Sequence, residues 1–300
     1  MFTEKRSYPP KKRIVRPTTR RFSRRTFIKG TAGVAASALI ADRFAPSSQA
    51  AFRTYLPYDP TRDAHYGYNY GWIEHHQPSL DATSEKFVFV RLKYPGGDWY
   101  TYAVDWYRYG FGKAPEVKFA EELAKNTSID VELHQHAQYV SIDDEHIFNY
   151  PYIFMSGHMG TSMSDAQIRR LREYLERGGF LHAEDCDIRF PLSRGGGMRY
   201  KMHDLMKRVF PDKKFERIDM SHPVYHTLFT HDEYLGGDKK LEGLSDFDEA
   251  IMVDDRIVVY LCPSDLGCAW EGRPCEPGGE EQRRWAFRQG MNIVAYSLTR

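Results

Sequence analysis

The side chains with the greatest chemical capacity in this sequence are carboxylates, imidazoles and thiols that follow short apolar segments. Four such segments, at residues 87–90, 152–155, 180–183 and 257–261, suit buried strands. In an open parallel sheet the carboxyl ends of the strands face one crevice, where ligands bind. The sequence therefore predicts a ligand-binding rim after these strands. Its expected members are Asp98, Trp99, His158, Asp185, Asp187, Arg189, Asp265 and Trp270.

A divalent metal ion is one candidate occupant of this rim. Imidazole nitrogens and carboxylate oxygens are ligands for zinc, manganese or iron, and such a site can keep a position open for water. The candidate ligands are His158, Asp185, Asp187, His222 and His226. The competing interpretation is that each His hydrogen-bonds a loop. His222 and His226 flank a Pro, and the sequence has no H-E-x-x-H motif.

A sugar is a second candidate occupant. Carbohydrate sites pair planar carboxylates with aromatic rings, and Asp98, Asp185 and Asp265 are candidates for the former, with Trp99 and Trp270 for stacking. Paired acids also catalyse glycoside hydrolysis, although their separation cannot be read from sequence. Among all these residues, the candidates for catalysis are Asp185, Cys186 and His158. The alternative interpretation of the rim is that its loops are polar only because they are solvated.

The elements that must position these residues alternate between strand and helix. Ser164 is a good helix N-cap with Gln167 three residues later, and Gly178-Gly179 ends that helix before the next strand. This is a βαβ unit, which implies parallel neighbouring strands. Asp254-Asp255 predicts a tight turn into the last strand, so one sheet edge is expected to be antiparallel. Further helices are predicted from Pro115, over 198–209 and over 285–298.

The N-terminal segment has the pattern of an export signal. Arg24 and Arg25, with Phe27 and Lys29 at the expected offsets, precede an apolar core of 11 residues, and Ser48-Gln49-Ala50 suits cleavage. A spanning helix needs about 20 apolar residues. We expect a twin-arginine signal, the twin-arginine translocase as a partner, and a periplasmic or otherwise exported protein without a transmembrane span.

Charge and composition narrow the class of protein. The leader carries 12 of the 42 Lys and Arg but only two of the 41 Asp and Glu, which leaves a net charge of about −9 for residues 51–300. Such an acidic domain is not expected to bind nucleic acid. We predict a signal peptide over 1–50, an N-terminal arm over 51–85 and one α/β domain over 86–300.

Export would place the four cysteines in an oxidising compartment. Cys268 and Cys275 bracket a short loop and are the expected disulfide, whereas Cys262 ends a β-branched run and is expected to be a buried small hydrophobe. Cys186 is expected to be unpaired.

A series of ordered motifs runs from about residue 85 to residue 298. They are Val90-Arg91-Leu92-Lys93-Tyr94, Gly97-Asp98-Trp99, Ser156-Gly157-His158, Gly178-Gly179-Phe180-Leu181, Glu184-Asp185-Cys186, His222-Pro223-Val224 with His226, and Asp265-Leu266-Gly267-Cys268-Ala269-Trp270-Glu271. In these motifs the chain resembles the bacterial domain-of-unknown-function family 4159. The resemblance implies a three-layer, flavodoxin-like, mostly parallel sheet with helices on both faces, related to class I glutamine amidotransferases and trehalose-utilisation proteins. It implies no particular reaction.

An amidotransferase-like fold would carry its nucleophile near Cys186. However, Asp185 and Asp187 flank this thiol where a working elbow needs small neighbours, and two carboxylates disfavour the reactive thiolate. Two classes of function stay open. One is a ligand-binding or scaffold domain with cell-envelope protein partners, and the other is a hydrolase-like enzyme, metal-assisted or carboxylate-based.

Overall fold

The computed structural model describes residues 86–97, 99, 113–135, 137–158, 160–186, 197–271 and 275–300. Its strands are β1 Val90–Lys93, β2 Gln138–Ser141, β3 Tyr152–Met155, β4 Phe180–Glu184, β5 Glu216–Arg217, β6 Glu249–Val253 and β7 Arg256–Cys262. Its helices are α4 Pro115–Asn126, α5 Asp165–Glu176, α6 Met198–Val209, α7 Leu266–Ala269 and α8 Gly279–Thr299, with short 3-10 helices η2 Glu145–Asn149 and η3 Pro223–Tyr225.

The strands form one sheet in the order β2-β1-β3-β4-β7-β6-β5. The first five in this order are parallel, and β6 and β5 are antiparallel to their neighbours. Asp254 and Asp255 join β6 to β7 with φ values of 49° and 58°. Two consecutive left-handed residues are typical of the tight hairpin turns that match strand twist. The predicted antiparallel edge is confirmed.

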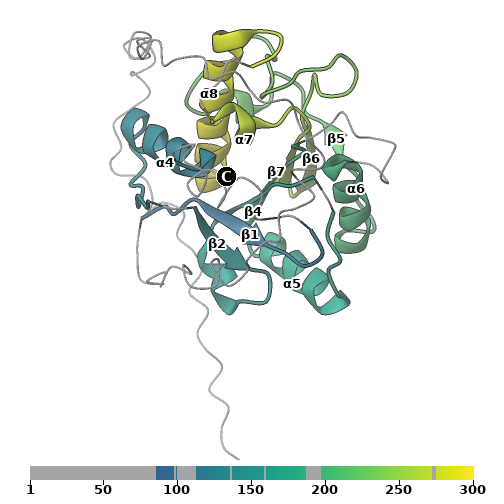
Figure 1. Cartoon of the computed structure of the whole chain (residues 1–300). Coiled ribbons are helices and arrows are strands. Elements are labelled where there is room, and N and C mark those ends of the chain that lie inside the picture. The colour runs from purple at the N-terminus through teal and green to yellow at the C-terminus, as the bar shows by residue number, and fades with distance from the viewer. Residues whose placement is uncertain are drawn as a thin grey trace, which may run out of the picture.

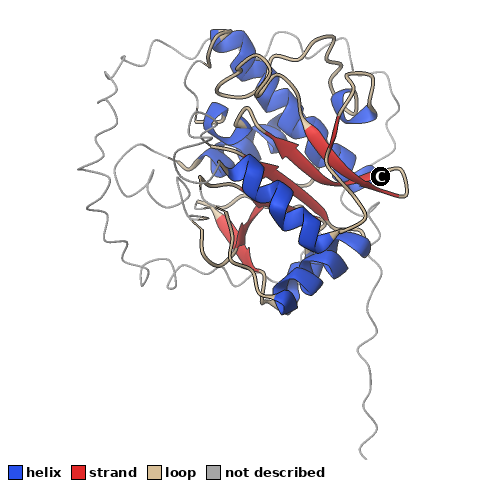
Figure 2. Cartoon of the chain, turned by 90° about the vertical axis from the view of Figure 1, so that its right-hand side faces the viewer, coloured by secondary structure: helices blue, strands red, loops and turns tan. Residues whose placement is uncertain are grey.

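Helices cover both faces of this sheet, with α4, α7 and α8 on one side and α5 and α6 on the other (Figures 1 and 2). Side chains alternate between faces along each strand. Ile153 and Met155 accordingly lie in the core beneath α5 and α6. Tyr152 and Phe154 lie in the core beneath α4 and α8. The predicted α/β class with a mostly parallel sheet is confirmed.

Local sequence signals placed several elements well. Ser164 Oγ accepts a hydrogen bond from the Gln167 amide while the Gln167 side chain accepts one from Ser164, which is the predicted capping box of α5. The first strand was placed too early, because β1 begins at Val90 and Phe87 makes only an isolated bridge to Val131. The hydrophobic residues 87–89 are buried, as their run predicts, but the bounds of β1 are determined by its hydrogen-bonded pairing with β2.

The predicted signal peptide (1–50), including Arg24 and Arg25, and the arm (51–85) lie outside the described residues. Asp98, Asp187 and Arg189 also lie outside them. Within the part of the chain that the structure describes, no helix combines the length and apolar character needed to cross a membrane.

Candidate functional site

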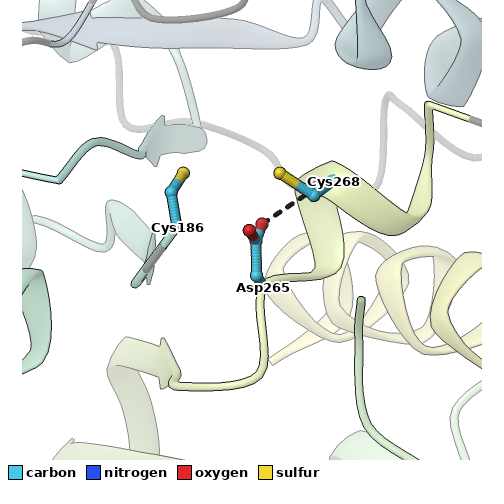
Figure 3. Close-up of side chains that lie close together, drawn as sticks. All are labelled: Cys186, Asp265 and Cys268. Atoms are coloured by element: carbon cyan, nitrogen blue, oxygen red, sulfur yellow. Dashed lines mark hydrogen bonds between the residues drawn. The ribbon is translucent and has the colours of Figure 1, made fainter. Parts of the chain in front are cut away.

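Two thiols and one carboxylate meet at the carboxyl edge of the parallel strands. Cys186 follows β4, and Asp265 and Cys268 follow the neighbouring strand β7. The two sulfurs and a carboxylate oxygen all lie within 4.8 Å of one another (Figure 3). Asp265 and Cys268 are buried and Cys186 is half-buried. We call these three residues the edge cluster.

Asp265 occupies a strained turn between β7 and α7. Its φ of 63° and ψ of 76° are left-handed, which costs a non-glycine residue about 1–3 kcal/mol. Its Oδ1 accepts a 2.9 Å hydrogen bond from the Cys268 amide, and the backbone of Gly237 packs against it so closely that a Cβ there would collide. The surrounding chain therefore fixes the direction of this carboxylate.

Glu184 places a second buried carboxylate beside the cluster. It ends β4, is 1% exposed, and accepts a 2.8 Å hydrogen bond from the amide of Gly267 in α7. Burial, followed by the charge of Asp265, raises the pKa of Glu184 well above its usual range. Burial, followed by the charge of Asp238, raises the pKa of Asp265 to about 6. Glu184 therefore favours its neutral form, whereas Asp265 holds its proton only in mildly acidic conditions.

The Cys186 thiol is not activated as a nucleophile. Its Sγ lies 2.9 Å from the Ser156 hydroxyl. Contact with the Cys268 thiol acts to lower the pKa of Cys186, but burial and the charges of Asp265 and Glu184 raise it to about 12. The protonated thiol is therefore strongly favoured, and the carboxylates responsible are Asp265 and Glu184, not the sequence neighbours Asp185 and Asp187 on which the expectation was based.

Of the two residues His158 and Asp185, both expected on this rim, only His158 is placed near the edge cluster by its interactions. The charge of His158 lowers the pKa of Asp265, which places the imidazole near the edge cluster. Asp185 is 2% exposed, and its Oδ2 accepts a 3.0 Å hydrogen bond from the amide of Arg199 in the first turn of α6. This hydrogen bond stabilises the N-terminus of α6. Because α6 covers the opposite face of the sheet from α7, Asp185 is directed away from the helix that carries Cys268.

The two tryptophans expected to stack on a sugar are core residues. Trp270 is 0% exposed, stacks on Phe119 at a ring separation of 4.2 Å, and donates to the carbonyl of Ala286. Trp99 is 6% exposed and contacts the ring of Tyr139 at 5.1 Å. Neither indole presents a face to a ligand, so the expected aromatic platform is wrong for both.

The structure places His222 and His226 away from the edge cluster. The His222 ring packs on Tyr296, whose hydroxyl accepts a hydrogen bond from Ile257 at the start of β7. His226 Nε2 lies 2.6 Å from the carbonyl oxygen of Met220. Because Ile257 is at the amino end of β7, His222 does not share a metal site with His158.

The predicted bridge between Cys268 and Cys275 is not formed in the structure, where none of the four cysteines takes part in a disulfide. The thiol of Cys268 lies instead beside that of Cys186. Cys275 contributes to the core beneath α8, and Cys262 is fully buried, as expected. The short sequence separation between Cys268 and Cys275 was therefore a poor guide, since α7 aims the Cys268 side chain toward β4.

Sequence reasoning missed Glu184 as a site residue and assigned Cys268 only to a disulfide. The alternation of β4 contained the signal for Glu184, because it shares a face with Phe180 and His182 and hence with α7. Cys268 had no comparable signal, since its approach to Cys186 depends on the pairing of β4 with β7.

The fold and the edge cluster together define an α/β protein that gathers polar side chains at the carboxyl ends of parallel strands. The chain belongs to the family described as domain of unknown function DUF4159, whose model matches residues 88–298. A comparison with curated proteins gives no match.

Proposed function

We propose that this protein is an exported ligand-binding α/β domain of the cell envelope, with its ligand held where β4 and β7 end. The observation that carries the proposal is the convergence of the Cys186, Asp265 and Cys268 donor atoms within 4.8 Å. These residues come from loops that are about 80 positions apart in the chain, and parallel strands bring such loops to one edge. Buried polar groups gathered in this way typically fix the orientation of a ligand.

The strand order supports the finer assignment to the flavodoxin-like group. The parallel part, β2-β1-β3-β4-β7, has the order 2-1-3-4-5 when only these strands are counted. In that group, ligands bind at the carboxyl edge. We therefore propose a flavodoxin-like domain related to class I glutamine amidotransferases, without their cysteine chemistry, because the Cys186 thiol favours its protonated form.

A hydrolase is the second candidate, and the backbone of Asp265 favours it. A left-handed residue at a sharp turn between a strand and a helix is how several hydrolases expose a reactive side chain. Here that residue is a carboxylate with a second carboxylate, Glu184, on the adjoining strand. This candidate predicts turnover of a small molecule or glycan that Asp265→Asn abolishes.

The binding proposal is tested by thermal shift with three classes of probe: divalent cations, inorganic phosphate and common disaccharides. We expect at least one class to raise the Tm of the wild-type protein clearly more than that of Asp265→Asn at the same probe concentration, because ligands stabilise the state that binds them. Asn tolerates the left-handed backbone, so the turn is retained. His222→Gln, at the other end of β7, is the matched control and should respond like wild type. An equal shift in Asp265→Asn, or no shift with any class, would contradict the proposal.

The export proposal rests on the sequence of the leader. Replacing Arg24 and Arg25 together with Lys is expected to leave uncleaved precursor in the cytoplasm, because a Lys pair does not reproduce the fork geometry of two guanidinium groups. Cell fractionation followed by immunoblotting measures this. Export of the Lys variant at the wild-type level would refute the assignment to the twin-arginine route.

A further inference from the structure

We infer that Cys186, Cys268 and Asp265 bind a thiophilic divalent cation of the zinc class. This inference rests on the proposed ligand-binding function and specifies its ligand. It shares no residue with the metal-ligand set expected from the sequence, which was His158, Asp185, Asp187, His222 and His226.

The spacing of the edge cluster suits a single ion. Zinc binds sulfur at about 2.3 Å and carboxylate oxygen at about 2.0–2.2 Å, so two tetrahedral sulfur ligands lie about 3.8 Å apart. The donor atoms of the edge cluster, all within 4.8 Å of one another, need only small movements to reach that geometry. Figure 3 shows the two thiols and the carboxylate directed toward a shared space.

The donor types select the class of ion. Thiolates favour zinc and other soft or borderline metals, whereas magnesium and calcium require oxygen ligands. Three protein donors also leave one tetrahedral position for water or for a bound molecule, which is the arrangement of catalytic rather than structural zinc sites.

Neighbouring residues hold the donors in place. The Asp265 carboxylate accepts a hydrogen bond from the amide of Cys268. Glu184 accepts one from the amide of Gly267, which lies between Asp265 and Cys268 in the sequence. The Ser156 hydroxyl contacts the Cys186 sulfur at 2.9 Å. Supporting contacts of this kind orient metal ligands before the ion arrives.

The charges at this edge also call for a cation. Glu184 and Asp265 are buried together, and the nearby guanidinium of Arg91 forms a buried ion pair with Glu116. A divalent ion would supply the positive charge that two deprotonated thiols and a carboxylate need.

The test is titration of the reduced, mature protein with Co²⁺, monitored through the thiolate-to-cobalt charge-transfer absorption. We expect one Co²⁺ per chain with this absorption, and its displacement by Zn²⁺. Because even supporting residues contribute about 10–100-fold to metal affinity, Cys186→Ser and Cys268→Ser should each weaken binding about 100-fold or more. Asp265→Asn should weaken binding while keeping the thiolate absorption. Cys275→Ser is the matched thiol control and should bind like wild type.

Absence of thiolate absorption in reduced wild type, or binding in either Cys186→Ser or Cys268→Ser with the wild-type affinity and the wild-type absorption intensity, would overturn the inference. If a variant fails to fold, alkylation of the wild-type protein tests the inference instead. The partly unfolded protein is treated with N-ethylmaleimide with and without Zn²⁺, and the modified cysteines are identified by peptide mapping. Zn²⁺ should protect Cys186 and Cys268 but not Cys275. Peptide mapping of the unreduced protein shows whether Cys268 forms a disulfide with Cys186 or with Cys275. If it forms either disulfide and the protein still binds no Co²⁺ after reduction, the inference is overturned. If Co²⁺ fails to bind but phosphate or a disaccharide gives an Asp265-dependent thermal shift, the proposed function stands and only the ion is wrong.

Discussion

Replacing Trp270 with alanine is expected to lower the free energy of unfolding by about 3–5 kcal/mol, the range typical of a fully buried aromatic residue. The indole is 0% exposed and stacks on Phe119, and its edge lies so near Gly290 that a Cβ there would be 2.8 Å from the ring. Phe154 and Phe89 contact the same ring. Removing it leaves a cavity where β3, α4 and α8 meet.

Urea denaturation of the mature protein measures this loss. Trp270→Phe is the graded control and should cost clearly less, because a phenyl ring fills much of the same space. If Trp270→Ala costs less than about 1 kcal/mol, the side chain is not the core anchor that the structure describes, and the ligand-stacking role expected from the sequence would regain support.

Replacing Glu116 with Gln is expected to cost about 3–5 kcal/mol of unfolding free energy, because it breaks a buried ion pair and leaves one charge uncompensated. Glu116 and Arg91 are each 3% exposed, and Arg91 also donates to the carbonyl of Trp99 at 2.8 Å. The pair joins α4 to β1 beneath the carboxyl edge. Stability measured by urea denaturation should therefore fall, although Gln preserves the size of the side chain.

Glu121→Gln is the matched control on the same helix. Its partner Lys113 is 53% exposed and Glu121 is 40% exposed, so the loss of this ion pair should cost no more than about 1 kcal/mol. The double variant Arg91→Met with Glu116→Leu should recover most of the lost stability, since apolar replacements of a whole buried pair are often tolerated. Equal effects of Glu116→Gln and Glu121→Gln would show that the Arg91 pair is not buried.

The elements that could be predicted are those specified by local chemistry. The capping box of Ser164 and Gln167 fixed the start of α5, and two aspartates marked the β6–β7 turn. The family was also recognised from its motifs, and its model matches residues 88–298. In contrast, the two-residue strand β5 has no hydrophobic pattern and exists only through pairing with β6.

The candidate site was only partly predictable, because the sequence shows which residues follow a strand but not which way each one faces. Asp185 and Glu184 are adjacent, yet the first supports α6 and the second supports α7. Trp270 lies in a polar loop by sequence and in the core by structure. The approach of Cys268 to Cys186 depends on the turn of Asp265, which no local pattern announces.

The most direct test of the account is the position of a bound ion in a crystal of the reduced, mature protein equilibrated with Zn²⁺. Anomalous diffraction at the zinc absorption edge should give a single strong peak bounded by Cys186 Sγ, Cys268 Sγ and the carboxylate of Asp265, at the ends of β4 and β7. A crystal with no peak at this edge, or with its only peak at His222 and His226, would contradict the claim that the edge cluster binds a zinc-class ion.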